Sequence, residues 1–397
     1  MRWEKSLSNR IIITKEAIKQ KEYIVTALFE DNRMIEVSCD NTRDRNILGN
    51  VYVGKIKRIV SKINAAFIEI APGEMTYLPL EDVKSPMMVK QLREGKLTEN
   101  DEIVVQIAKE AVKTKSPTVT TNITFQGNAV VLTTENKKLG ISQKLDKSKR
   151  KHYQEIFADK KTDEFGLIIR TIAGNYADDE IFAEFDSIYA KFQQIQATYK
   201  HRTCYSCLYH GASPYIAGVK ERLSGNIEKI ITDDKEIYQE LVEESGFKPE
   251  HIVYYEDNLL SLSALYGLKF KLEEALQERV WLKSGAYLII QPTEALTVID
   301  VNSGKCIKGN QKDFYLKVNL EAAEEIARQL RLRNISGICI VDFINMDTEE
   351  ARQELVRELK KYLAKDTVPV VFVDFTKLGL AEITRKKVKK PLWEQVK

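Results

Sequence analysis

Two apolar runs in the last third of the chain each deliver an aspartate near their end. The first, "LTVIDVN", carries Asp300 and Asn302, and the second, "ICIVDFI", carries Asp342. Between them, apolar residues recur at helical spacing on one face, namely Leu320, Ala323, Ala327 and Leu330. A strand, a helix and a strand in this order form a βαβ unit with two parallel strands. We therefore expect Asp300 and Asp342 at one edge of a sheet, the edge where open α/β sheets bind ligands.

The segments around this unit predict a parallel, helix-covered sheet. "AYLIIQ" and "LTVIDV" are joined by "PTEA" as in a hairpin, and "VPVVFVDFT" adds a further strand. Asn319 is predicted to cap the helix before Asp342, and Asp347 with Glu350 predicts a capping box for the following helix. The final stretch, residues 384–397, is strongly basic and is expected to be an exposed tail.

The pair of aspartates predicts a divalent metal site. Two carboxylates brought together without paired cations repel each other, and a divalent cation relieves this repulsion. Ligation by oxygen alone favours Mg²⁺, with Mn²⁺ as the alternative, over zinc. Asn302 lies two residues beyond Asp300 in a strand, so its side chain points to the same face and can orient a ligand or an attacking water. The pattern by itself fits strand-end aspartates that cap turns equally well.

The first two thirds of the chain are rich in short strands. Residues 11–37 contain three β-type runs and predict antiparallel strands. Residues 50–110 hold several short strands separated by Gly, Pro and Asn, a pattern typical of a small barrel. Two further strands, "NAVVLTT" and "FGLIIRTIAG", flank a charged helical stretch at 144–160, and another helix follows at 178–200. A chain of 397 residues with this pattern is expected to be a mixed α/β, multidomain protein.

Composition narrows the class of protein. The 61 basic and 58 acidic residues leave a net charge of +3, so nucleic-acid binding has to rest on local patches. No apolar run reaches the ~18 residues needed to span a bilayer, and the start of the chain lacks the apolar stretch of a secretory signal. No membrane partner is therefore expected, and scattered cysteines favour a reducing, cytoplasmic location. In "HRTCYSCLYH" a second CxxC is missing, so ordinary, partly buried cysteines at Cys204 and Cys207 are favoured over zinc ligands.

Two aromatic side chains are candidates for base stacking. In "NAAFIEIA", the residues Ala66, Ile68 and Ile70 alternate on the core face, which leaves Phe67 on the opposite face. An exposed aromatic side chain on a small barrel can stack on unpaired bases. Tyr77, in "TYLPL", is a second candidate, and a core tyrosine at a strand end is the alternative interpretation.

An arginine and a threonine follow another apolar strand. "GLIIRT" ends in Arg170 and Thr171, and an arginine fork beside a hydroxyl suits a terminal phosphate. An ordinary strand end at the surface fits the same pattern.

Three stretches of the sequence closely resemble the ribonuclease E/G family. They are "EALTVIDVNSGK", "NLEAAEEIARQLRLRNISGICIVDFINM" and the upstream "AAFIEIAPGEMTYLPL". The last third resembles the family almost without gaps, and weaker similarity runs through nearly the whole chain. The resemblance implies a Mg²⁺-dependent endoribonuclease of RNA processing and decay. It would cut single-stranded, A/U-rich RNA, leave 5′-phosphate and 3′-hydroxyl ends, and prefer 5′-monophosphorylated substrates.

The resemblance also implies a domain arrangement. A split ribonuclease-H-like domain would occupy residues 1–38 and 216–279. An S1 domain, an OB-type barrel, would occupy residues 39–121 and a 5′-sensor domain residues 122–215. A DNase-I-like α/β catalytic domain would occupy residues 280–397.

The functional positions of the family map onto individual residues here. As the resemblance implies, they are the metal ligands Asp300 and Asp342, the supporting catalytic residue Asn302, the RNA contacts Phe67, Tyr77 and Lys115, and the 5′-phosphate contacts Arg170 and Thr171. Lys115 stands among many lysines, and the resemblance alone singles it out.

The chain departs from the family's pattern at its C-terminal end. Family members commonly continue into a CPxC segment that links two subunits through zinc, and this sequence ends at "KKPLWEQVK". No zinc link is therefore expected, and a homodimer is the expected assembly rather than a zinc-linked tetramer. The long scaffolding tail of some members is also absent, so the short ribonuclease G form is the closer match.

Two other interpretations stay open. A catalytically silent S1-type RNA-binding protein would not need Asp300 or Asp342. A different Mg²⁺ enzyme, such as a phosphatase or a DNA nuclease, would use the same sheet edge but would not explain the barrel aromatics or the Arg170–Thr171 pair.

Overall fold

The computed structural model describes residues 9–30, 32–42, 47–93, 95–109, 111, 116–160, 163–220, 222, 227–304, 311–346 and 348–397. The chain is a mixed α/β protein that divides into two compact units. Unit 1 comprises Met1–Asp44, Asn226–Glu243 and Phe247–Lys397, and unit 2 comprises Arg45–Gly225 and Glu244–Gly246. Within the ranges described, no helix is both long and apolar enough to cross a membrane.

The first sheet of unit 1 joins two segments that lie far apart in the sequence. β1, β2 and β3 form an antiparallel meander, which confirms the strands predicted for residues 11–37. β1 also pairs in parallel with β15, and β15 in parallel with β16. Helices α5 and α6 pack apolar side chains against the sheet. The elements of this region are β1 (Asn9–Ile18), β2 (Lys21–Glu30), β3 (Arg33–Asn41), β15 (Ile227–Thr232), α4 (Lys235–Glu244), β16 (Ile252–Tyr254), α5 (Leu262–Tyr266) and α6 (Leu268–Leu276).

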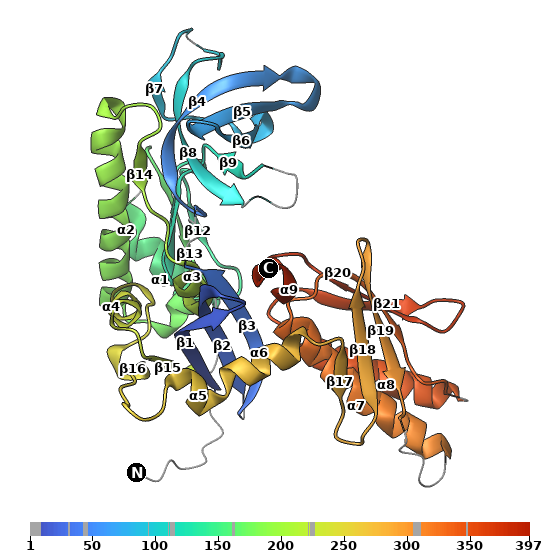
Figure 1. The fold of residues 1–397 in the computed structure, drawn as a ribbon. Helices are drawn as coiled ribbons and strands as arrows, with labels where there is room; N and C mark the ends of the chain where they lie inside the picture. The colour runs from blue at the N-terminus through green and yellow to red at the C-terminus, as the bar shows by residue number, and fades with distance from the viewer. Residues whose placement is uncertain are drawn as a thin grey trace. The chain divides into compact units, whose positions relative to one another are not determined.

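Unit 2 contains the closed barrel that residues 50–110 predict (Figure 1). The barrel closes because β4 pairs with both β5 and β8, while β6 and β9 complete the ring. Its interior is filled by fully buried aliphatic side chains such as Ile56, Ile68 and Ile103. The elements are β4 (Val51–Val60), β5 (Ala65–Ala71), β6 (Glu74–Pro79), β8 (Glu102–Lys109) and β9 (Thr118–Thr120), with β7 (Met88–Lys90) and β14 (Cys207–Tyr209) paired at the sides.

The other sheet of unit 2 has its strands in the order β10, β11, β13, β12. Helix α2 confirms the helix predicted at 178–200, and it buries a side chain every three or four residues, namely Ile181, Phe185, Ile188, Phe192 and Ile195. These side chains share one core with the sheet. The elements are β10 (Thr124–Gln126), β11 (Val130–Thr133), β12 (Leu139–Ile141), α1 (Lys147–Ile156), β13 (Gly166–Ile169), α2 (Asp178–Thr198) and the following α3 (Pro214–Lys220).

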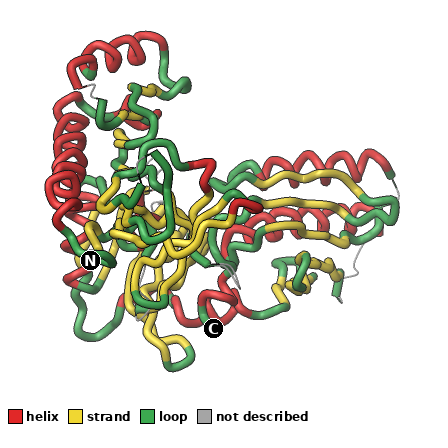
Figure 2. Tube along the Cα trace, turned by 90° about the horizontal axis from the view of Figure 1, so that it is seen from above, coloured by secondary structure: helices red, strands yellow, loops and turns green. Residues whose placement is uncertain are grey.

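The C-terminal part of unit 1 is a six-stranded sheet with two long helices on one face. Side chains on one face of the strands, including Ile299 and Val341, share a core with α7 and α8. Figure 2 shows helices, in red, running along the strands, in yellow. The opposite face, called the open face below, carries exposed side chains such as Val298 and Ile338. The elements are β17 (Arg279–Trp281), β18 (Tyr287–Pro292), β19 (Leu296–Asn302), α7 (Gln311–Leu332), β20 (Gly337–Asp342), α8 (Glu349–Leu363), β21 (Val370–Phe375), β22 (Ala381–Arg385) and α9 (Leu392–Gln395).

The predicted βαβ unit and the predicted hairpin of β18 and β19 are confirmed, but the prediction that the following strands continue a parallel, helix-covered sheet is wrong. β19 and β20 run parallel, and the other pairings in this sheet are antiparallel. The difference arises at β22, which forms a hairpin with β21 and pairs with β20. Because a hairpin needs no crossover helix, helices cover only one face of the sheet.

The exposed tail predicted for residues 384–397 is also wrong. Arg385 is buried in β22, where its Nε donates to Asp366 Oδ2 at 2.8 Å. Leu392 in α9 is fully buried and its backbone N–H donates to the carbonyl of Arg333 at 2.9 Å. Most of the exposed lysines of this segment lie between these two anchors, in residues 386–390. A few buried side chains therefore decide where this basic segment goes.

Two predicted helix caps need correction. Helix α7 extends back to Gln311, so Asn319 lies inside the helix and does not cap it. The predicted capping box includes Asp347, which lies outside the described residues. Helix α8 is capped by Thr348, whose hydroxyl accepts a hydrogen bond from the N–H of Ala351 at 3.3 Å.

Candidate functional site

The two predicted aspartates lie next to each other on the open face of the six-stranded sheet. Asp300, near the end of β19, and Asp342, at the end of β20, are direct partners in the parallel register. Paired residues of neighbouring strands lie roughly 5 Å apart and point to the same face. Asp300 is half-buried and Asp342 is exposed. The sheet thus brings both carboxylates to the edge where the βαβ pattern places them.

Asn302 orients one of these carboxylates. Its Nδ2 donates a hydrogen bond to Asp300 Oδ2 at 2.6 Å. The bond occupies one oxygen of the Asp300 carboxylate. Asn302 therefore contacts Asp300 directly, as expected for two residues that alternate along one strand face.

The structure adds a residue whose part in the site the sequence did not indicate. Asn319 is fully buried in α7. Its Nδ2 donates to the carbonyl of Ile344 at 2.7 Å, and its Oδ1 accepts from the N–H of Ile344 at 3.0 Å. Ile344 follows Asp342 by two residues, so this amide ties the helix to the segment that carries the carboxylate. The available signal was an asparagine between buried helix positions, which the sequence pattern alone assigns to a cap.

The donor set suits a hard divalent cation. Within the described residues, no salt bridge is formed to Asp300 or Asp342, and no three His, Cys, Asp or Glu side chains converge as a ready-made metal site. Mg²⁺ commonly takes one or two carboxylates and completes its octahedral shell with water and phosphate oxygens. Two aspartates on an open face fit that mode of binding, in which a substrate phosphate supplies further ligands.

The barrel presents a short row of side chains on its outer surface. Phe67 and Tyr77 are cross-strand partners, both half-buried, with ring centroids 6.1 Å apart and planes at 74°. Arg58 is exposed on β4 as the cross-strand partner of Phe67. Sequence reasoning missed Arg58 because nothing local distinguishes it from its basic neighbours, whereas the register places it beside the aromatic pair. Lys115 lies outside the described residues.

Arg170 and Thr171 directly follow β13 and are both exposed. The Nη1 of Arg170 donates to the carbonyl of Gly127 at 3.2 Å, which partly orients the guanidinium. The hydroxyl oxygens of Thr171 and Ser142 lie 2.7 Å apart in a hydrogen bond. An arginine fork beside two hydroxyl groups can offer several hydrogen bonds to one phosphate.

The described cysteines near residue 205 do not form a zinc-like cluster. Cys204 and Cys207 are free thiols of intermediate exposure, and Cys207 Sγ lies 3.8 Å from His210 Nδ1. Burial raises the pKa of both thiols. A raised pKa disfavours the thiolate, which is the form that binds metal.

Comparison with known proteins decides the family. A model of the ribonuclease E/G family matches residues 124–388, well over half of the chain. The chain is a member of the ribonuclease E/G family. Ribonuclease G of Haemophilus influenzae is 31% identical over 383 residues, which cover 92% of this chain and 78% of the relative. Ribonuclease G of Escherichia coli strain K12 is 28% identical over 376 residues, with 90% and 76% covered.

The longer relatives of the ribonuclease E/G family are matched over a smaller share of their length. Ribonuclease E of Synechocystis sp. is 30% identical over 393 residues, which cover 96% of this chain and 58% of that protein. The family match at residues 124–388 includes Asp300, Asp342 and Arg170, while the barrel aromatics precede it. The mixed α/β fold with its closed barrel agrees with membership of this family.

Proposed function

We propose that this member of the ribonuclease E/G family is a Mg²⁺-dependent endoribonuclease with Asp300, Asp342 and Asn302 as its catalytic residues. It cuts single-stranded, A/U-rich RNA, leaves 5′-phosphate and 3′-hydroxyl ends, and prefers 5′-monophosphorylated substrates. The relatives named Ribonuclease G and Ribonuclease E support an endoribonuclease of RNA processing. The observation that carries the metal-dependent part is the direct register pairing of Asp300 with Asp342 on an open face.

Each residue of the site has a defined task in this proposal. Asp300 and Asp342 hold the cation, and Asn302 keeps the Asp300 carboxylate in one orientation through its 2.6 Å hydrogen bond. When bound, Mg²⁺ lowers the pKa of water and stabilises the charge that grows on the phosphate. Two carboxylates without a cation repel a phosphate, and a bound cation offsets that repulsion at the cut phosphate. Asn319 holds the segment after Asp342 in place.

The outer surface of the barrel is the proposed binding site for the unpaired RNA strand. Phe67 and Tyr77 offer aromatic faces on which bases stack, and Arg58 offers a cation for the backbone beside them. Lys115 is kept in this set from the family resemblance alone. We assign the barrel to the S1 domain and the sheet that carries Arg170 to the 5′-sensor domain. The five-stranded sheet of unit 1 and the six-stranded sheet are assigned to the ribonuclease-H-like and DNase-I-like domains.

The test of the catalytic residues compares aspartates of the same sheet. Asp300→Asn and Asp342→Asn keep the shape of the side chain but remove the charge that binds the cation, so cleavage of a single-stranded oligonucleotide should be lost. RNA binding and thermal midpoint should stay close to the wild type. Asp374→Asn is the matched control, because Asp374 is an exposed aspartate on β21. Near wild-type cleavage by either site variant would sink the assignment.

The same assay separates the main rival. A catalytically silent RNA-binding protein would bind the oligonucleotide and leave it intact at every Mg²⁺ or Mn²⁺ concentration. A DNA nuclease or phosphatase would instead act on a DNA strand or a phosphomonoester in preference to RNA.

The sensor assignment is tested by a ratio of two rates. Arg170→Gln should slow cleavage of 5′-monophosphorylated RNA and hardly change the slower cleavage of 5′-hydroxyl RNA, because only the first substrate presents a terminal phosphate. Arg202→Gln, at another exposed arginine of unit 2, should leave the ratio unchanged. If the wild type cuts both substrates equally, Arg170 and Thr171 are not a sensor.

A further inference from the structure

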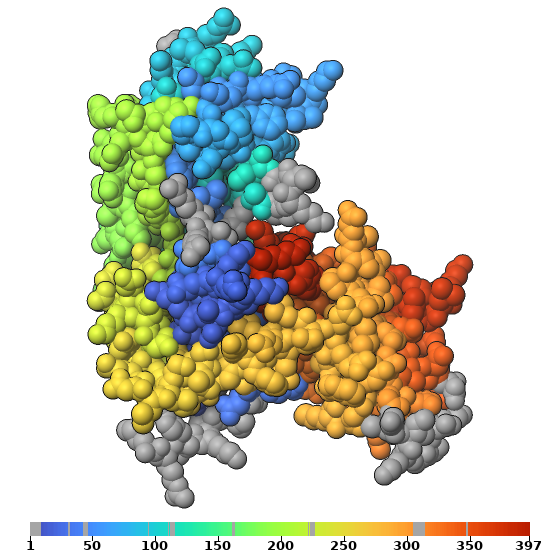
Figure 3. All heavy atoms as spheres, viewed as in Figure 1, coloured from blue at the N-terminus to red at the C-terminus, as the bar shows by residue number. Residues whose placement is uncertain are grey.

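An aromatic pair, with one exposed and one half-buried side chain, lies beside the candidate catalytic residues on the open face of the sheet. Trp281 on β17 is the register partner of Tyr287 on β18, and Tyr287 is the partner of Asn302 on β19. The ring centroids of Trp281 and Tyr287 are 5.2 Å apart, and Trp281 is 63% exposed. Cross-strand partners point to the same face, so these side chains form one row that ends at the catalytic asparagine. Figure 3 shows the region around residue 290, in orange, at the molecular surface.

An arginine completes this aromatic cluster. The guanidinium carbon of Arg279 lies 4.8 Å from the ring centroid of Tyr287 and 5.7 Å from that of Trp281. In the neighbouring row, Arg279 is the partner of Ile289, and Ile289 is the partner of Asp300. A guanidinium that stacks on aromatic rings keeps its in-plane N–H groups available for a phosphate. The cluster therefore joins two aromatic rings to a cation on the face that carries the carboxylates.

Folding does not explain the exposure of Trp281. The side chain that packs toward the helices from β17 is Val280, whereas Trp281 points to the open face. A single exposed aromatic residue is common on protein surfaces. Here a tryptophan, a tyrosine and an arginine contact one another, with the two ring planes at 60°, within two strands of Asp300. Aromatic side chains accompanied by an arginine are a common means of binding unpaired bases.

We propose that Trp281, Tyr287 and Arg279 form a stacking platform for a base that neighbours the cut phosphate of single-stranded RNA. The proposal rests on the endoribonuclease function given above. Tyr287 lies one strand and Trp281 two strands from Asn302, which is roughly 5 and 10 Å along the sheet. A base stacked on this platform leaves its phosphate directed toward the carboxylates, and Arg279 offsets the charge of the backbone. Stacking accepts every base, so the platform adds affinity and register rather than sequence preference.

The test measures binding of single-stranded RNA to the full chain without divalent metal, so that cleavage plays no part. Trp281→Ala should weaken binding about tenfold, and Trp281→Phe should restore most of it, because phenylalanine keeps an aromatic face. The matched control is Phe270→Ala, since Phe270 is 65% exposed on α6, a helix that packs with the five-stranded sheet. Its affinity should equal that of the wild type.

A set of RNAs with one abasic position each then locates the stacked base. At a single position next to the cut site, loss of the base should cost the wild type about tenfold and cost Trp281→Ala nothing further. Equal binding by wild type and Trp281→Ala, or additive losses at every abasic position, would overturn the platform. If the wild type binds no single-stranded RNA at all, the proposed function itself fails, which is a distinct outcome.

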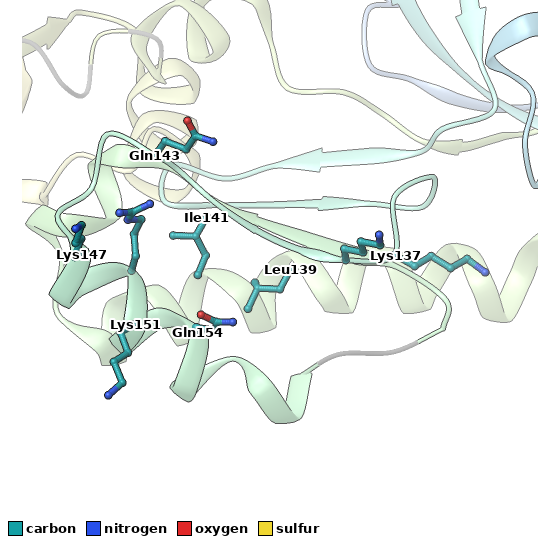
Figure 4. A pocket seen from close by; sticks show the side chains of 9 residues that line it. Lys137, Leu139, Ile141, Gln143, Lys147, Lys151 and Gln154 are labelled. Atoms are coloured by element: carbon teal, nitrogen blue, oxygen red, sulfur yellow. The ribbon is translucent and has the colours of Figure 1, made fainter.

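A second, independent observation is a basic hollow in unit 2. The hollow has a volume of about 680 Å³ and lies between β12 and α1 (Figure 4). Its lining residues include five cations and no carboxylate, and the cations are Lys137, Lys138, Lys147, Arg150 and Lys151. Leu139 and Ile141 of β12 point into it. The Nε of Arg150 is buried and has no hydrogen-bond partner among the described residues.

We infer that this hollow binds the phosphate backbone of single-stranded RNA. The four lysines are exposed, and Lys151 forms an ion pair with Glu155 at 3.9 Å. Such an exposed i, i+4 pair is worth little in water, so it leaves the hollow basic. An orphan N–H beside converging cations is suited to an anionic oxygen. The strand β12, which lines the hollow, leads into Ser142, and the hydroxyl oxygens of Ser142 and Thr171 are hydrogen-bonded at 2.7 Å. Nucleotides that follow the 5′ end are therefore the natural occupants.

Salt dependence tests this inference. A variant with Lys147→Gln, Arg150→Gln and Lys151→Gln should reduce the slope of log affinity against log salt concentration by about 2, as expected for three lost phosphate contacts on a single strand. A control triple, Lys360→Gln, Lys361→Gln and Lys365→Gln, removes the same charge from exposed lysines at the end of α8 and just after it, and should leave the slope unchanged. An unchanged slope in the first variant would overturn the inference. Displacement of RNA by polyglutamate at equal affinity would instead mark the hollow as a site for acidic protein segments.

Discussion

Replacement of the buried Asn319 tests how the segment after Asp342 is stabilised. Asn319→Ala removes two hydrogen bonds, at 2.7 and 3.0 Å, that join α7 to the backbone of Ile344. Each bond contributes about 1 kcal/mol net, and a polar group left without a partner costs about 1–3 kcal/mol. Ile344 is half-buried, so water can reach part of its backbone. The free energy of unfolding should therefore fall by about 2–4 kcal/mol.

The loss of stability should be accompanied by a change in metal dependence. Replacement of a residue that holds a metal ligand in place typically lowers metal affinity or activity by about 10–100-fold. We therefore expect the Mg²⁺ concentration for half-maximal cleavage to rise by about tenfold or more in Asn319→Ala. The two measurements are urea unfolding followed by circular dichroism and RNA cleavage across a Mg²⁺ titration, both at a temperature where the variant is folded.

A neighbouring asparagine provides the control for Asn319. Asn345 is exposed in the segment just after Ile344, so Asn345→Ala should change neither the unfolding free energy nor the Mg²⁺ titration. If Asn319→Ala lost less than about 0.5 kcal/mol of stability, the hydrogen-bond argument would be refuted. If stability fell but the Mg²⁺ titration did not move, Asn319 would be a structural residue without influence on Asp342.

Three further predictions concern the barrel and the C-terminal sheet. Phe67→Ala should weaken binding of single-stranded RNA by about 1–3 kcal/mol without lowering the thermal midpoint, and unfolding with unchanged affinity per folded molecule would show a core role instead. Asp366→Ala should lower the free energy of unfolding by about 3 kcal/mol in urea titration, because it leaves Arg385, 4% exposed in a buried pair, without its carboxylate; a loss below about 1 kcal/mol would contradict this. The Tyr205 hydroxyl donates to Glu69 and, with Lys57, lowers the pKa of that carboxyl from 4.5 to about 2. Stability from Glu69 is therefore present above pH 4.5 and lost as the pH falls toward 2, so Glu69→Gln should flatten the decline of the thermal midpoint in this range.

Local sequence patterns were sufficient to predict most of the helices and strands. The apolar spacing on α7, the three strands at the start of the chain and the alternation around Phe67 all follow from periodicity within one segment, which a single element obeys wherever it lies. The placement of Asp300 and Asp342 at one sheet edge also followed from the sequence. A strand, helix and strand connect in only one common way, and this rule needs no knowledge of distant contacts.

Pairing between strands that are distant in the sequence decided the remaining features of the sheet. The sequence placed Asp300 and Asp342 at the same edge, but only the register makes them direct partners. The basic segment around Arg385 became a strand because β20 and β21 provide partners for its backbone, a contact between distant residues that no local pattern contains.

Side chains whose roles depend on contacts with distant residues could not be predicted from the sequence, for the same reason. Asparagine is a residue type that often caps helices. Asn319 instead links α7 to Ile344 through two hydrogen bonds, because the segment after β20 lies against α7. Trp281, in the apolar run "VWL", resembles a core residue, and only the strand pairing places it on the open face beside Asn302. The sequence by itself determined which segments become strands and helices and which of them end in acidic residues. The tertiary structure decided which side chains meet, because pairing between strands depends on contacts that the chain makes only when it is folded.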